Sequence, residues 1–460
     1  MGLGVLETFS PSMLRKITRL ATDGVSFDAA TTAAEEVLEL DLKVKRVERL
    51  TERHGARRVV EREQSVAEWA GNTLLDKLQA PPGVKAPTVV CVSCDGGRVQ
   101  RCDLPETAAS HWSETKVGVL LELQPQAHTS DPCPQIPTKF LDLAEMEKVT
   151  REIKRAVPKG QVFTRCETSD THAGPDQHTA DERAATRSAE GKTSLENLSP
   201  DPAAVTPQTP APKDPVAAAR VVAVPPKVLS RDLVASLAGS HAFGKHLAAQ
   251  AWQMGFSAAT TKAFVADGGS ANWGIWEREF KHQKYVPILD FIHALTYVFS
   301  AAMAGRSREA GTPVYHRWIT WVWQGQVPQV IVELAQRAAE LGSPPADASD
   351  TDPRKVVAET LTYLTNQQSR MNYPTYRQAG LPVTSSHIES AVKQIGRRVK
   401  GSEKFWTESG AEALLQLRAD QLSDSRPLDG FWRRQIDHAT GTQPYAPRGP
   451  RQTTKSQSSA

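Results

Sequence analysis

Apolar residues in the first 80 positions recur at helical spacing. Met13 and Ile17 fall on one face of a helix, and no stretch there alternates as a strand would. Residues 26–58 predict two short helices joined by a turn near Leu40, the second rich in Lys and Arg. This is the outline of a helix-turn-helix. A pair of amphipathic helices that merely exposes a basic face to solvent explains the pattern equally well.

Short β-branched runs after the proline-rich break at 81–83 predict buried strands. The first run is followed by Asp95 and two glycines, which predict a turn at 95–97. Two later strands each end at a carboxylate, Asp267 or Asp290. Because predicted helices alternate with these strands, the pattern indicates a mixed α/β sheet with helices on its faces. The predicted strands are 88–92, 116–123, 228–237, 262–267 and 285–289, and the helices between the later ones are 243–254 and 272–280.

The rest of the chain divides into helical and low-complexity stretches. Only helical patterns occur from His293 to about Thr365, and a long helix begins near Ser386. Residues 126–226 are instead dominated by Pro, Thr, Ser and Ala, with one plausible helix at 141–157. Because such a composition buries little apolar surface, most of this stretch is predicted to be disordered, as is the tail at 440–460.

The 460 residues are enough for two or three domains plus linkers. A formal net charge of +3 permits nucleic-acid binding without requiring it. The five cysteines are an odd number in the first half of the chain, and no secretory segment is recognised before them, so we expect a cytoplasmic protein. The most apolar window, 288–305, is barely long enough to span a membrane and contains Asp290 and His293, which favours a core segment.

Cys91 and Cys94 have the spacing of half a zinc site. No second pair at metal-ligand spacing accompanies them, so the interior of a strand is the better interpretation. The histidines at positions 241, 246, 282 and 316 also lack paired ligand spacing.

Three carboxylates stand where side chains reach into a cleft. Asp95 and Asp267 close predicted strands, and Glu389 lies on the first turn of a late helix. Carboxylates of this kind can hold two divalent ions, roughly 3.5–4 Å apart, for an in-line phosphodiester displacement. Mg²⁺ suits such a site because it prefers a few carboxylates together with phosphate oxygens. Among 52 acidic residues, however, spacing alone does not single these three out.

The sequence stretches around these carboxylates are more specific than the spacing of the carboxylates. The sequence resembles bacterial insertion-sequence transposases of the ISKra type, which are DDE enzymes with a ribonuclease-H-like catalytic fold. The matching stretches cover most of 88–123 and 229–432, and the most specific is the long ordered string at 370–424, which holds the Glu in register. The other stretches are CVSCDGGRVQ at 91–100, HWSETKVGVL at 111–120, HAFGKHLAAQAWQMGF at 241–256, FVADGGSANWGIWE at 264–277 and VPILDFIHAL at 286–295.

The resemblance implies that Asp95, Asp267 and Glu389 are the catalytic triad and the ligands of two Mg²⁺ or Mn²⁺ ions. Asp290 and His293 match an Asp-x-x-His signature that is thought to support the site. The implied reaction is hydrolysis at the ends of the element, followed by attack of the freed 3′-hydroxyl on target DNA. The chain departs from the family pattern in its long Pro-rich insert and in the lack of a clear cysteine-rich element near the N-terminus, which leaves the mode of end recognition open.

The implied architecture is a ribonuclease-H-like α/β core with a helical insertion, preceded by an all-α DNA-binding region. The expected segments are a helical DNA-binding region at 1–85, catalytic parts at 86–125 and 227–300, a mostly disordered insert at 126–226, a helical insertion at 301–384, the Glu helix and C-terminal helices at 385–439, and a disordered tail at 440–460.

Basic and aromatic residues near the triad are candidate DNA contacts. Lys393, Arg397 and Lys400 lie near the helical face of Glu389, where they could hold phosphates, and Arg398 is on the same helix. A solvated basic face is the alternative. Arg317 precedes Trp318, Trp321 and Trp323; one ring, such as Trp321, could stack on a distorted base, although core packing explains the tryptophans at least as well.

The expected partners are the terminal inverted repeats of an element and target DNA, bound by a homo-oligomer of at least two subunits in the bacterial cytoplasm near the nucleoid, with no membrane. Two rivals stay open. One is a transposase-derived DNA-binding protein without catalysis, and the other is a structure-specific nuclease of the same fold.

Overall fold

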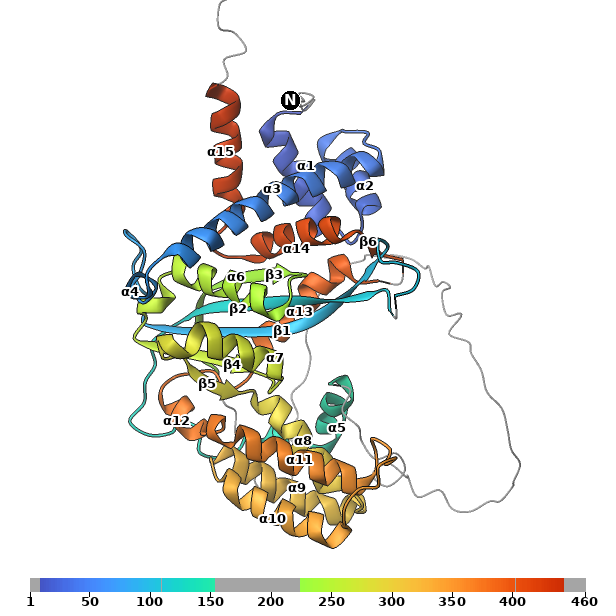
Figure 1. Ribbon diagram of the computed structural model, residues 1–460, viewed down its shortest axis with the longest axis vertical. Coiled ribbons are helices and arrows are strands. Elements are labelled where there is room, and N and C mark those ends of the chain that lie inside the picture. The colour runs from blue at the N-terminus through green and yellow to red at the C-terminus, as the bar shows by residue number, and fades with distance from the viewer. Residues whose placement is uncertain (1–8, 109, 154–223, 402, 442–460) are drawn as a thin grey trace, which may run out of the picture. The chain divides into compact units, whose positions relative to one another are not determined.

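A mixed β-sheet forms the centre of the computed structural model (Figure 1). Its strand order is β3-β2-β1-β4-β5, and the short β6 pairs with the far end of β1. β1, β2 and β3 are antiparallel neighbours, whereas β4 and β5 run parallel to β1. The predicted mixed α/β architecture is therefore confirmed. The strands are β1 Val89–Arg101, β2 Trp112–Leu123, β3 Val228–Ser236, β4 Thr261–Ala266, β5 Val286–Leu289 and β6 Phe405–Trp406.

The structure describes residues 9–108, 110–153, 224–401 and 403–441, all of which belong to one compact unit. No helix in these ranges is long and apolar enough to cross a membrane. The helices that bear on the site are α6 Ser240–Gln253, α7 Ser270–Ile275, α8 Phe291–Met303, α9 Arg308–Trp323, α10 Val327–Leu341, α11 Pro353–Gln367, α12 Tyr373–Gln378 and α13 Ser386–Val399.

The turn predicted at 95–97 is wrong, because β1 continues through it to Arg101. Gly96 and Gly97 pair with Lys116 and Thr115 of β2. A Cβ at Gly97 would lie 2.7 Å from Thr115 Oγ1, so the glycine serves close packing between strands and not a chain reversal.

The N-terminal helices are α1 Pro11–Asp23, α2 Phe27–Leu38 and α3 Val44–Gly71. The turn predicted near Leu40 is confirmed, but the second helix is much longer than expected. One face of α3 packs against α14 (Glu408–Leu422), where a Cβ at Gly55 would lie 2.6 Å from that of Ala413. Residues 9–85 therefore belong to the same compact unit as the sheet, and α3 packs against α1, α2, α6 and α14. The remaining helices are α4 Leu74–Lys77 and α15 Pro427–Gly441.

The helix predicted at 141–157 is confirmed over Leu143–Glu152, but residues 126–140, which were predicted to be disordered, are ordered as well. Residues 126–153 contain a 3-10 turn, Thr138–Leu141, and helix α5, Leu143–Glu152. They are tied to the helical insertion by hydrogen bonds from Trp323 Nε1 to the Cys133 carbonyl (2.8 Å) and from Tyr315 Oη to the Phe140 carbonyl (2.6 Å). Residues 154–223 and the tail from 442 lie outside the described residues.

Candidate active site

Asp95 and Asp267 lie on neighbouring parallel strands. β1 pairs with β4 in a register that places Ser93 opposite Val265, and each aspartate follows two residues later. Because neighbouring strands are about 4.8 Å apart, this register brings the two side chains to the same edge of the sheet. Burial raises the pKa of Asp95, the Gly96 N–H opposes that shift, and the charge of Asp267 adds to it.

A tight loop after β4 holds Asp267. Its Oδ1 accepts hydrogen bonds from the Gly269 N–H and Asn272 Nδ2, both at 2.9 Å. Tyr363 of α11 donates to the Asp267 carbonyl at 2.8 Å. Gly268 has a φ of +95°, and a Cβ there would lie 2.7 Å from Tyr363 Oη, so this position requires glycine. The helical insertion therefore positions the second carboxylate.

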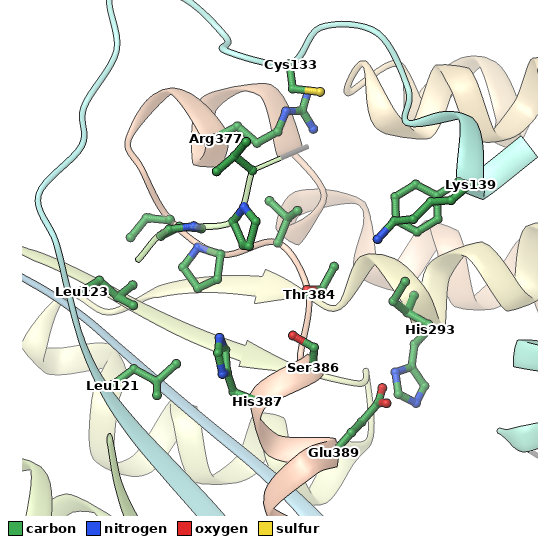
Figure 2. Close-up of a pocket in the computed structure, with 18 of the residues that line it drawn as sticks. Leu121, Leu123, Cys133, Lys139, His293, Arg377, Thr384, Ser386, His387 and Glu389 are labelled. Atoms are coloured by element: carbon green, nitrogen blue, oxygen red, sulfur yellow. The ribbon is translucent and has the colours of Figure 1, made fainter. Parts of the chain in front are cut away.

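Glu389 comes from the first turn of α13, which packs against β1 and β2. It lines a pocket of about 880 Å³ together with Asp95 and His293. Figure 2 shows the Glu389 carboxylate next to the His293 ring. Burial and the charge of Asp290 raise the pKa of Glu389, while His293 and Lys393 oppose the shift. Asp95 and Glu389 thus line one pocket, and Asp267 follows the strand next to Asp95 without lining that pocket.

Asp290 has a different environment from these three carboxylates. It is completely buried and caps α8 by accepting from the Ile292 N–H at 3.1 Å. Ser385 donates to it from Oγ at 2.7 Å and from its backbone N–H at 3.1 Å, and His293 Nδ1 lies 2.7 Å from Oδ2. With both oxygens occupied, Asp290 joins α8 to the start of α13 and positions Glu389.

The surroundings of His293 favour its protonated form. Burial opposes that charge, but the hydrogen bond and charge of Asp290, with Asp267 and Asp95 behind it, raise the His293 pKa to about 9. Burial likewise opposes the charge on Asp290, but its contacts with His293 and Ser385 lower the Asp290 pKa below its usual value.

The His293–Asp290 pair should make stability depend on pH. Since the folded pKa of His293 is raised from 6.5 to about 9, its contribution is complete below pH 6.5 and is lost as the pH rises through 9. The shift corresponds to roughly 3 kcal/mol. Urea unfolding in chelator should therefore show the stability gap between wild type and His293→Gln shrinking between pH 6.5 and 10. A gap that stays constant over that range would contradict the assignment.

The charges at this site favour a cation. Among the described residues, Asp95, Asp267 and Glu389 have no ion-pair partner, although Asp95 and Glu389 are partly buried. No three Asp, Glu, His or Cys side chains in the described ranges are grouped closely enough to hold a metal ion. Mutual repulsion keeps carboxylates apart, so a cation would have to draw these three together. Hard oxygen donors of this kind suit Mg²⁺ or Mn²⁺.

No protein-family model and no curated protein matches this chain. A function must therefore be argued from the geometry of the site.

The predicted basic residues of α13 separate into two groups. Lys393, Arg397 and Lys400 are exposed and line a groove beside the β1–β2 hairpin. Arg398 faces the other way and is 2% exposed. Its Nε donates to the Ala21 carbonyl at 2.8 Å, and its guanidinium lies 4.4 Å from the centre of the Phe27 ring. The prediction that Arg398 contacts DNA is therefore wrong. Arg398 instead joins α13 to the N-terminal helices.

The tryptophans of α9 are mainly core residues. Trp318 and Trp323 are 1% exposed, which confirms the packing interpretation for both, and Trp323 also lines the pocket. Trp321 is half-buried under the Arg317 guanidinium, 5.5 Å from its ring centre. Arg317 is paired with Glu333 at 2.6 Å. Neither Arg317 nor Trp321 lines the pocket or the groove, so their contact with DNA stays a prediction.

Two supporting residues were not predicted from the sequence. Asn272 joins Asp267 to β1, because its Oδ1 accepts from Cys94 Sγ at 3.4 Å. Ser385 holds Asp290. Their positions, five residues after Asp267 and four before Glu389, were a usable signal, since polar side chains at helix starts commonly hold neighbouring groups. Cys91 and Cys94 are buried in β1, as the strand interpretation predicts.

Proposed function

We propose that this protein is a metal-dependent DNA transposase of the DDE type, built on a ribonuclease-H-like core. The observation that carries the proposal is that Asp95 and Asp267 follow paired positions of neighbouring parallel strands and that Glu389 lines the same pocket as Asp95, none of the three having an ion-pair partner among the described residues. The strand order β3-β2-β1-β4-β5, with three antiparallel strands followed by two parallel ones, supports the fold assignment.

The five residues of the site would have two kinds of role in the proposed reaction. Asp95, Asp267 and Glu389 would hold the ions, which activate an attacking oxygen and stabilise the leaving one. Asp290 and His293 keep the start of α13 in place and so fix the position of Glu389. Water attacks first, at the end of the element, and the freed 3′-oxygen then attacks target DNA. Handling two ends requires at least two subunits.

Incubating the protein with DNA fragments that carry the two flanks of its gene tests the proposal. We expect strand breaks at the element ends and joined products in Mg²⁺ or Mn²⁺, and none in excess chelator. Sequencing gels score the breaks, and a labelled 3′ end transferred to plasmid scores the joining. Breaks without joining would identify the rival nuclease of the same fold. Tight binding without breaks would identify the DNA-binding protein that lacks catalysis, and undiminished cleavage in chelator would reject metal-dependent chemistry altogether.

A further inference from the structure

The pocket at the carboxylates is larger than phosphodiester chemistry requires. Its volume of about 880 Å³ lies within the roughly 300–1,000 Å³ of pockets that bury drug-sized ligands. Leu121, Leu123 and Val383 give it apolar walls. Figure 2 shows the His387 ring and the Lys139 ammonium group reaching into it from different sides. A flat group with polar edges, such as a nucleobase, fits this lining.

A second hollow, of about 930 Å³, runs between the β1–β2 hairpin and α13. Gly96, Gly97 and Gly396 line this hollow, so no side chain fills it at these positions. A Cβ at Gly396 would meet no atom within 4 Å. Between the end of the β4 pairing at Ser93 and the start of the β6 pairing at Gln100, no described strand pairs with the edge of β1 opposite β2. A backbone can therefore approach the protein closely in this groove.

The groove has an excess of positive charge. Its exposed cations have no ion-pair partner among the described residues, and its acidic side chain, Glu114, is already paired with Lys116 at 2.9 Å. Unpaired cations along a glycine-lined surface are suited to phosphates. The four cations are Arg98, Lys393, Arg397 and Lys400.

The groove and the pocket meet at Val392 and Lys393, which line both, with Asp95 and Glu389 on the pocket side. We propose that together they bind an unpaired strand of DNA, with its phosphates along the groove and a base in the pocket. A base inside a duplex cannot enter the pocket, because it must first leave the stack. The inference rests on the proposed function and names its substrate: DNA that is unpaired beside the carboxylates.

The test measures binding in chelator, so that it does not depend on cleavage. The full chain is titrated against fluorescein-labelled oligo-deoxythymidylate of about 12 nucleotides, free or annealed to oligo-deoxyadenylate. The groove variants are Gly396→Trp and the triple Arg98→Ala, Arg397→Ala and Lys400→Ala. Arg278→Ala removes an exposed cation outside both hollows and is the matched control.

Each groove variant should weaken single-strand binding by at least about tenfold and leave duplex binding within about twofold of wild type. The triple variant should also lower the slope of log affinity against log salt by about 2, since three lost phosphate contacts at about 0.7 each give that value. Arg278→Ala should change neither. Equal losses for duplex and single strand, or no loss, would overturn the inference.

Filling the pocket tests the base site separately. Thr384→Trp places a large ring among the pocket residues and should reduce single-strand binding selectively, by about tenfold. Unchanged single-strand affinity would remove the pocket from the proposal. If this variant fails to fold, the triple groove variant still decides, because its three side chains are exposed. If the protein cleaves element ends but does not prefer single-stranded DNA, this inference is rejected and the proposed function is not. If the protein prefers single-stranded DNA but does not cleave element ends, the proposed function is rejected and the single-strand site is not.

Discussion

Asp267→Asn should reduce DNA cleavage by on the order of 10³-fold or more, whereas Asp290→Asn should leave measurable activity. Asp267 keeps an oxygen free of protein donors, since both of its hydrogen bonds go to Oδ1. Both oxygens of Asp290 are already engaged by Ser385, Ile292 and His293, so they are not available to an ion. Losing the Asp290 charge should displace Glu389 slightly, and losing the Asp267 charge should remove a ligand outright.

Cleavage of element-end DNA over a Mn²⁺ titration separates these roles. Asp290→Asn should recover part of its activity at high Mn²⁺, and Asp267→Asn should not. Asp347→Asn, in the exposed loop between α10 and α11, is the matched control and should behave as wild type. An active Asp267→Asn beside an inactive Asp290→Asn would show that the second ligand is assigned to the wrong carboxylate.

Arg377→Ala should destabilise the fold by about 2–3 kcal/mol, because it leaves the partly buried Asp131 carboxylate without its guanidinium partner. Arg377 is 7% exposed; its Nε donates to Asp131 Oδ1 at 2.8 Å, and its Nη2 also binds Asp131 and the Trp323 carbonyl. The guanidinium lies 3.9 Å from the centre of the Trp323 ring. This contact joins residues 126–153 to the helical insertion.

Urea unfolding measures the effect. Arg317→Ala is the comparison, because the exposed Arg317–Glu333 pair should contribute no more than about 1 kcal/mol. Replacing both members, with Arg377→Met and Asp131→Leu, should recover much of the loss, since neither charge is then left without its partner. A loss for Arg377→Ala as small as that for Arg317→Ala would show that the segment is held by other contacts.

The strands could be predicted because apolar β-branched runs mark them locally. The pairing of Asp95 with Asp267 was implied by the family resemblance, since the spacing of the carboxylates alone does not single them out. The glycines after Asp95 were misassigned, since the reason for Gly97 is Thr115 on the neighbouring strand, which a local turn rule does not consider. The Pro-rich composition likewise gave no sign of the order in 126–140, before the predicted helix.

Contacts distant in sequence account for the remaining differences. The segment around Cys133 is held by Trp323 and Arg377, about 190 and 240 residues away. A Pro-rich stretch with little apolar surface becomes ordered when another element supplies the packing surface, and the stretch itself does not record that. Arg398 is similar: its helical position suggested DNA, and the Ala21 carbonyl that it binds lies 377 residues earlier.

The packing of α3 on α14 also constrains how the chain is made. Gly55 of α3 rests against Ala413, which follows it by 358 residues. At about 5–20 residues per second, the ribosome takes roughly 20–70 s to synthesise that interval. During that time α3 has neither Ala413 of α14 to cover Gly55 nor Phe431 and Trp432 of α15 to cover His54. We therefore expect the N-terminal helices of nascent chains to depend on chaperones and to be cut early in limited proteolysis, until the last helices emerge and close the fold.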